Sequence, residues 1–224
     1  MCEFFMPLDY KKLYEKICEL YAKTEHFSYG HWDETFFTLR VFEICKELIS
    51  KTRLKVNEEV ILTAAILHDA GKIKLDTPEK IENDWDKHSI YGAEMARKIL
   101  QEEHLNNEFI EKVIFLVKYH NIRPNKLDMI RPNELKILQD AELLADMGIA
   151  DFIKPFLRTA ISKKKTLDCV NFIRENQKDK ANLLRKNKQS LNLRISKKIA
   201  NKLIKESIEL NNKIFKITNS ELLE

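Results

Sequence analysis

Apolar residues recur at intervals of three and four through most of this chain, whereas strict alternation of apolar and polar residues is almost absent. This spacing places apolar side chains on one face of an α-helix, and it is not the pattern of a half-buried strand. Only 4 Gly and 5 Pro occur in 224 residues, so the turns that a many-stranded sandwich or barrel requires are scarce. The sequence therefore predicts an all-α fold.

Helix starts are predicted where a side chain can accept hydrogen bonds from the first turn, as at Asp33, Asn57 and Asn133. Three or four further helices are expected within residues 150–218, the last of them beginning at Ser196. The predicted helices of the first 150 residues are 8–23, 33–51, 57–70, 88–103, 107–120 and 133–148, with loops at 71–87 and 123–132.

Charge is distributed unevenly along the chain. Residues 151–224 carry 18 Lys and Arg against 8 Asp and Glu, and residues 1–150 carry 21 against 27. A basic segment can bind a phosphate-rich partner, but an ordinary solvated helix face has the same composition, and this second interpretation is favoured. Because no repeat or linker is evident, we predict a helical core in residues 1–150 and a basic helical extension in residues 151–224, packed together as a single domain.

The cysteines and the apolar segments of the sequence indicate the cellular location of the protein. The 4 Cys lie far apart without a C-x-x-C pair, which favours reduced thiols over disulfides or a cysteine zinc site. No apolar run approaches the roughly 18–20 residues of a membrane span, and the first ten residues lack a signal-peptide pattern. We therefore expect a cytoplasmic protein without a membrane partner, and the oligomeric state is left open.

The most informative segment reads Leu-His-Asp-Ala-Gly-Lys and ends at Lys72. It places His68 and Asp69 at the end of an apolar helix, with Gly71 where a left-handed turn would end that helix. Imidazole and carboxylate together bind divalent metals, and one carboxylate can bridge two ions. A lysine beside them can bind phosphate or protonate a leaving oxygen. The alternative, a solvated helix end that compensates the helix dipole, is disfavoured by the apolar residues before the pair.

With this segment and three others, residues 31–150 resemble the HD-domain metal-dependent phosphohydrolases. In that family a His-Asp pair is accompanied by an early His, often by two more His, and by a late acidic residue. The segment Asp-Lys-His-Ser-Ile-Tyr-Gly-Ala-Glu around His88 resembles that of the third histidine, and Lys-Tyr-His ending at His120 that of the fourth. Residues 138–144, Leu-Gln-Asp-Ala-Glu-Leu-Leu, resemble the late acidic segment. The resemblance implies an orthogonal helix bundle around a metal centre, with additional C-terminal helices.

The early histidine is not at its usual place. Family members carry it three residues before an Arg-Val pair, and here Phe37 stands three residues before Arg40-Val41. His31 is the preferred first ligand, reaching in from the preceding loop, because it lies about 240° from Phe37 around an ideal helix. Asp33, one turn before Phe37 on the same face, is the alternative, and it can equally be a helix N-cap.

The late acidic position and the extra histidines complete the implied site. By alignment the family ligand falls on Glu142, whereas Asp140 matches an acid that in relatives more often supports a ligand. Both residues are retained as candidate ligands. The two additional histidines distinguish phosphodiesterase-like members with two metals from mononuclear, nucleotidase-like ones. The resemblance implies metal ligands His31, His68, Asp69, His88, His120, Asp140 and Glu142, catalytic residues Lys72 and Asp69, and substrate-binding residues Lys72 and Arg123, with Asn121 as an alternative to Arg123.

The resemblance further implies a hydrolase for phosphate esters. A water bound by two divalent ions loses a proton near neutral pH, so no protein nucleophile is needed. Mixed His and carboxylate ligands favour two Fe or Mn ions, with Mg, Ni, Co or Zn as alternatives. We expect a small phosphorylated substrate, a phosphodiester such as a cyclic phosphate or nucleotide. Two alternatives are a mononuclear HD nucleotidase that cleaves phosphomonoesters, and a degenerate HD module that binds a nucleotide or, as a less expected partner, RNA.

Overall fold

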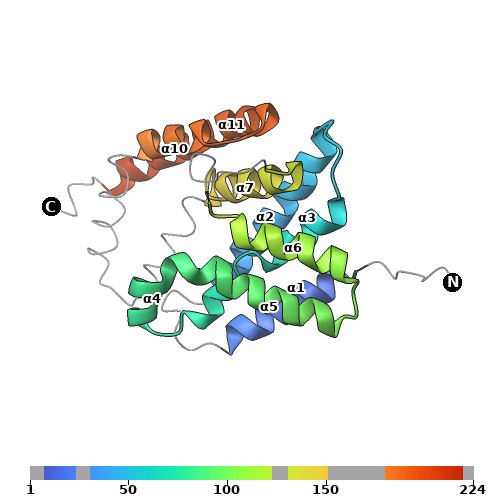
Figure 1. Cartoon of the computed structure of the whole chain (residues 1–224). Coiled ribbons are helices and arrows are strands. Elements are labelled where there is room, and N and C mark those ends of the chain that lie inside the picture. Colours follow the sequence, from blue (N-terminus) through green and yellow to red (C-terminus); the bar gives the residue numbers. More distant parts are fainter. Residues whose placement is uncertain (1–7, 24–30, 123–130, 151–179, 219–224) are drawn as a thin grey trace.

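The structure is a computed structural model of the chain, and it describes residues 8–23, 31–122, 131–150 and 180–218 (Figure 1). All the regular elements of these residues are helical, which confirms the predicted all-α fold. In chain order they are α1 (Tyr10–Ala22), α2 (His31–Lys51), α3 (Glu58–Leu67), the 3₁₀ helix η1 (Ala70–Lys74), α4 (Pro78–Asp84), the 3₁₀ helix η2 (Trp85–Lys87), α5 (His88–Glu102), α6 (Asn107–Tyr119), α7 (Asn133–Ala145), α10 (Lys180–Gln189) and α11 (Arg194–Thr218).

The predicted cap at Asn57 is confirmed, because its side chain accepts a hydrogen bond from the Val60 N–H at the start of α3. Other helices begin earlier than predicted. Both α2 and α11 begin two residues before the predicted caps Asp33 and Ser196, and Asn133 is itself the first residue of α7. The predicted cap residues lie inside the observed helices because Ser, Asp and Asn also occur within the first turn of a helix.

Residues 71–87 were predicted to form a loop, and this prediction is wrong, since η1, α4 and η2 occupy most of them. The start of α4 follows the usual rules. The hydroxyl oxygen of Thr77 accepts a hydrogen bond from the Lys80 N–H, and Pro78 stands at the first helical position, where its missing N–H costs nothing. The sequence pair Thr77-Pro78 is the feature from which the start of α4 could have been predicted.

The central helix of the bundle is α3. Every residue from Val60 to Leu67 is buried, and α1, α2, α6 and α7 all contact this helix. A helix that is apolar on all sides must be surrounded by other elements, which explains why α3 shows no polar face. Figure 1 shows its short ribbon among the longer helices of the bundle. Because α3 ends at Leu67, it places the following His-Asp pair in the interior.

A close approach at Gly71 joins η1 to α5. A Cβ atom at Gly71 would lie 1.9 Å from the carbonyl oxygen of His88 and 2.3 Å from the backbone nitrogen of Gly92. Among the described residues, only His104 and Gly148 have positive φ. The predicted left-handed turn at Gly71 is therefore wrong, and glycine is required there because two backbones meet.

The C-terminal helices attach to the core through α7 and α2, both of which α11 contacts (Figure 1). The Gly148 N–H after α7 donates a hydrogen bond to Ser207 Oγ of α11 over 2.9 Å. The predicted boundary at residue 150 adjoins residues 151–179, which lie outside the described residues, so it stays a prediction. Within the described part of the chain, no helix has both the length and the apolarity needed to cross a bilayer.

Candidate metal centre

His68 and Asp69 lie between α3 and η1, and both are buried, with 0% and 3% of their surfaces exposed. The Asp69 backbone carbonyl accepts a hydrogen bond of 2.7 Å from the hydroxyl of Tyr21 on α1. A hydrogen bond from α1 therefore fixes the main chain from which the Asp69 side chain projects.

Two further imidazoles converge on Asp69. His88 is the first residue of α5, and His120 caps the C-terminal end of α6. Their Nε2 atoms lie 3.5 and 3.6 Å from Asp69 Oδ1 and 3.3 Å from each other. Among the described residues, Asp69, His88 and His120 are the one group of at least three possible ligands whose ligand atoms all lie within 4.8 Å of one another.

Backbone carbonyls determine which nitrogen of each imidazole carries the proton. Because a carbonyl only accepts, each Nδ1 must donate, and in the neutral ring each Nε2 is left with a lone pair. The Nε2 atom of His68 is buried and makes no hydrogen bond within the described residues. These lone pairs and the carboxylate fit a divalent metal ion. The Nδ1 atoms of His68, His88 and His120 lie 2.8, 2.6 and 2.6 Å from the carbonyl oxygens of Ala65, Trp85 and Val117.

Lys72 binds the other oxygen of Asp69. Its Nζ lies 2.7 Å from Oδ2, and the side chain of Lys72 is only 9% exposed. The ammonium also lies 5.3 Å from the ring centre of Trp85 and 5.9 Å from that of Phe37. The structure thus brings the predicted Lys72 and Asp69 together as a buried ion pair.

The charges of the cluster shift its pKa values. Burial alone would raise the pKa of Asp69, but the ammonium of Lys72 and then the imidazole of His68 hold it well below its usual value. Burial lowers the pKa of His88 to about 4, although the charge of Asp69 opposes this shift. At neutral pH Asp69 is therefore ionised and His88 neutral, which are the forms that bind a metal.

The two late acids differ in their surroundings. Burial alone would lower the pKa of His68, but the charge of Asp69 and, after it, that of Glu142 raise it, so Glu142 acts on the His68 side of the cluster. The oxygens of Asp140 instead accept hydrogen bonds of 2.7 and 2.9 Å from the backbone N–H groups of Asn192 and Leu193. Asp140 therefore contacts the segment before α11 and is not among the ligand atoms that lie together around Asp69.

The first-ligand position of the family faces the cluster. Phe37 is 2% exposed, and its ring centre lies 6.0 Å from that of His68. His31 is the first residue of α2 and not, as predicted, part of a preceding loop. The side chains of His31 and Asp33 lie outside the described part of the structure, as does the whole of Arg123, so their predicted roles stay predictions.

Tyr21 was missed by the sequence analysis, although its hydroxyl orients the main chain of Asp69. The signal was its place in α1, where the buried residues Leu13, Ile17 and Tyr21 recur every four positions. A tyrosine on such a stripe must find a partner for its hydroxyl in the interior. Which partner it finds depends on how α1 packs against η1.

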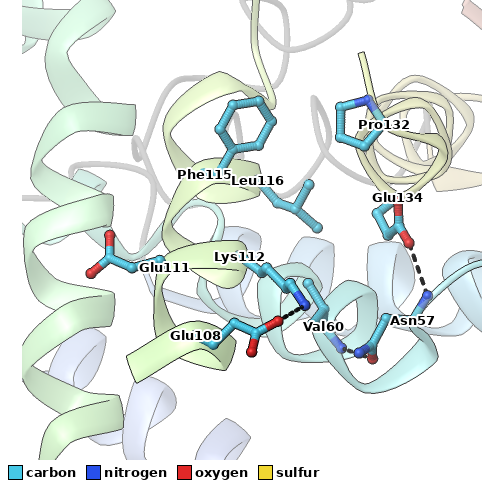
Figure 2. Close-up of a pocket in the computed structure, with 9 residues that line it drawn as sticks. All are labelled: Asn57, Val60, Glu108, Glu111, Lys112, Phe115, Leu116, Pro132 and Glu134. Carbon is cyan, nitrogen blue, oxygen red and sulfur yellow. Dashed lines mark hydrogen bonds and ion pairs between the residues drawn. The ribbon is translucent and has the colours of Figure 1, made fainter. Parts of the chain in front are cut away.

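Two surface hollows lie away from the cluster. One of about 640 Å³ lies between α3, α6 and the start of α7, with apolar walls formed by Val60, Phe115 and Leu116 (Figure 2). Acidic groups at its edge already have partners, since Glu108 binds Lys112. The second, of about 1000 Å³, is lined by basic side chains of residues 51–54 and 188–201. No residue of the cluster lines either hollow.

Helices packed around a buried carboxylate and three imidazoles define this molecule as an all-α protein with a candidate metal centre. The family model of the HD domain matches residues 38–147 of the chain, beginning directly after Phe37. Residues 38–147 therefore match an HD domain, and the resemblance noted in the sequence is confirmed.

Solved structures share this fold. A protein of an uncultured Thermotogales bacterium, described as a predicted HD superfamily hydrolase, is 18% identical with a TM-score of 0.59, over 92% of this chain and 90% of that chain. Bacillus subtilis YpgQ, solved in complex with ADP, is 14% identical with a TM-score of 0.60, over 96% and 100%. Lin1889 of Listeria innocua is 16% identical with a TM-score of 0.55, over 96% and 100%. No curated protein matches the sequence.

Proposed function

We propose that the protein is a metal-dependent phosphohydrolase whose metal centre is built around Asp69. One observation carries the proposal: the buried Nε2 atoms of His88 and His120 face each other and Asp69 Oδ1 with their lone pairs. A mixed nitrogen and oxygen set of this kind suits Fe²⁺ or Mn²⁺. The match of residues 38–147 to the HD domain family, and the likeness to a structure described as an HD superfamily hydrolase, support hydrolytic chemistry.

A divalent ion at the cluster would polarise a water molecule and neutralise charge on phosphate oxygens. The residues of the chain prepare the site for these tasks. Backbone carbonyls bind Nδ1 of the imidazoles and so favour the tautomer that has its lone pair on Nε2. The ammonium of Lys72 keeps Asp69 ionised. The same ammonium is the donor best placed to bind an oxygen of the phosphoryl group.

We propose a phosphodiester, such as a cyclic phosphate or a nucleotide derivative, as the substrate class. The complex of YpgQ with ADP supports a nucleotide. The family resemblance associates the extra histidines, His88 and His120, with phosphodiesterases, and both lie in the cluster. The same resemblance implies two metal ions, whereas the contacts of Asp69 favour one.

Turnover of two model substrates tests the proposal. The full chain, purified without chelators and supplied with Mn²⁺ or anaerobic Fe²⁺, should hydrolyse bis(p-nitrophenyl) phosphate faster than p-nitrophenyl phosphate. His120→Ala should lower kcat/KM by more than roughly 100-fold, because loss of a residue that merely supports a ligand already costs about 10–100-fold. His104→Asn is the matched control, since His104 is exposed between α5 and α6, and it should retain full activity.

Other outcomes favour the alternatives. Faster cleavage of the monoester would favour a nucleotidase over the phosphodiesterase. Binding of ADP or RNA without any turnover, unaffected by His68→Ala and falling steeply with salt, would favour the binding module.

A further inference from the structure

The two carboxylate oxygens of Asp69 face different partners. Oδ1 lies 3.5 Å from His88 Nε2 and 3.6 Å from His120 Nε2, whereas Oδ2 lies 2.7 Å from Lys72 Nζ. We propose that the centre binds one divalent ion, on the Oδ1 side, and that the ammonium of Lys72 takes the place of a second cation beside Oδ2. This inference rests on the proposed function only in requiring that the cluster bind a metal.

The Oδ1 side offers a complete ligand set for one ion. Asp69, His88 and His120 supply one oxygen and two nitrogen donors, and all three residues are buried. Three protein ligands that leave the remaining positions open are typical of catalytic metal sites. An ion on this side therefore needs no donor from the Oδ2 side.

The Oδ2 side lacks a donor at the position where the family pattern places one. Phe37 occupies that position, and its ring centre lies 6.0 Å from the ring centre of His68. An aromatic hydrocarbon ring offers a metal ion no lone pair, but the face of such a ring attracts an ammonium group. The Nζ atom of Lys72 lies 5.9 Å from the ring centre of Phe37 and 5.3 Å from that of Trp85, so these surroundings suit the lysine better than a metal ion.

The ammonium also excludes a second ion by its charge. A buried ammonium has lost its hydration and depends on its carboxylate partner, here Asp69. A divalent ion at Oδ2 would have to displace Lys72 or lie beside it, and like charges repel strongly where water is excluded. Because the lysine is tethered three residues from Asp69, it competes at a high effective concentration.

One donor nevertheless remains on the Oδ2 side, and it makes a gain of metal testable. His68 Nε2 lies 3.3 Å from Asp69 Oδ2. Replacing Phe37 by an imidazole and Lys72 by an uncharged side chain should complete a second metal site with His68 Nε2 and Asp69 Oδ2.

Counting bound metal ions tests the inference without using activity. The full chain is stripped with a chelator, dialysed and titrated with Mn²⁺, and bound ions are counted by calorimetry and by electron paramagnetic resonance. The wild-type protein should bind one ion and show the six-line spectrum of an isolated Mn²⁺. The double variant Phe37→His/Lys72→Met should bind two and show an exchange-coupled spectrum. Phe37→Leu/Lys72→Met, the matched control, should stay at one.

Several outcomes would overturn the inference. Two ions of similar affinity in the wild-type protein would do so without any variant, and their reduction to one by His31→Ala would identify His31 as the first ligand. A folded Phe37→His/Lys72→Met protein that still binds one ion would also overturn it. No bound ion in the wild-type protein would remove the proposed function too, whereas one bound ion without phosphate ester hydrolysis would remove the proposed function alone.

Discussion

The Nε2 atoms of His88 and His120 lie 3.3 Å apart in the interior of the bundle, although the Nδ1 atom of each ring is directed at a backbone carbonyl. With both Nδ1 atoms donating, neither Nε2 carries a proton in the neutral ring, so the two face each other as acceptors. Buried polar atoms in folded proteins are normally satisfied. The fold therefore holds these imidazoles where a shared cation satisfies both.

We predict that Gly71→Ala will destabilise the protein by at least the upper end of the roughly 1–3 kcal/mol typical of overpacking. The new Cβ would lie 1.9 Å from the His88 carbonyl oxygen, and neither backbone can move without shifting η1 or α5. Gly92→Ala is the matched control, because its Cβ would meet the His68 carbonyl oxygen at 3.2 Å and should cost less. Urea unfolding measures both, and equal stability of the two variants would contradict the close-approach explanation.

Tyr21→Phe should affect both stability and metal binding. It removes the 2.7 Å hydrogen bond to the Asp69 carbonyl and leaves a buried acceptor without this donor, at a cost of about 1–3 kcal/mol. Since the bond orients a ligand, we expect Mn²⁺ affinity to fall by roughly 10–100-fold. Tyr14→Phe, on the same helix, removes a bond to the Thr35 carbonyl and should lower stability alone. Calorimetry that shows equal Mn²⁺ affinities would reduce Tyr21 to a packing residue.

Asp140→Ala is expected to lower stability by about 3 kcal/mol or more while Mn²⁺ affinity is retained. Its carboxylate accepts hydrogen bonds from Asn192 and Leu193 before α11, and bonds to a charged group contribute roughly 1.5–3 kcal/mol each. Glu134→Gln, at an exposed bond of the same helix, should change stability little. Loss of metal with unchanged unfolding would restore Asp140 as a ligand.

The pH dependence of the metal-free protein should show the lowered pKa of His88. Burial brings this pKa to about 4, while the unfolded chain takes up the proton near its ordinary value of about 6.5. The stabilising contribution is therefore complete above pH 6.5 and is lost as the pH falls towards 4, by about 2 kcal/mol at pH 5.

Urea unfolding of wild-type protein and His88→Gln at pH 7 and pH 5 measures this effect. The stability difference between the two proteins should shrink at pH 5, because the variant has no proton to take up at residue 88. The comparison also removes the contribution of His68, whose raised pKa acts in the opposite direction. A difference that stays constant with pH would contradict the prediction.

Local features of the sequence were enough to predict the helical fold and to indicate the candidate ligands that the structure brings together. The helical spacing of apolar residues and the cap at Asn57 depend on neighbours within a few positions. The family pattern indicated His68, Asp69, His88 and His120 for the same reason, since each is recognised from the few residues around it. Their convergence could be expected from the pattern, and the structure contains it.

Only the tertiary structure decided which partner each of these side chains contacts. Asp140 and Glu142 are two residues apart, yet one faces the start of α11 and the other acts on His68. Glycine is required at residue 71 because the backbone of α5 lies against it, and the hydroxyl of Tyr21 finds its partner in the backbone of Asp69. Each relationship joins segments that are distant in the chain, so it depends on how whole helices pack and not on local spacing.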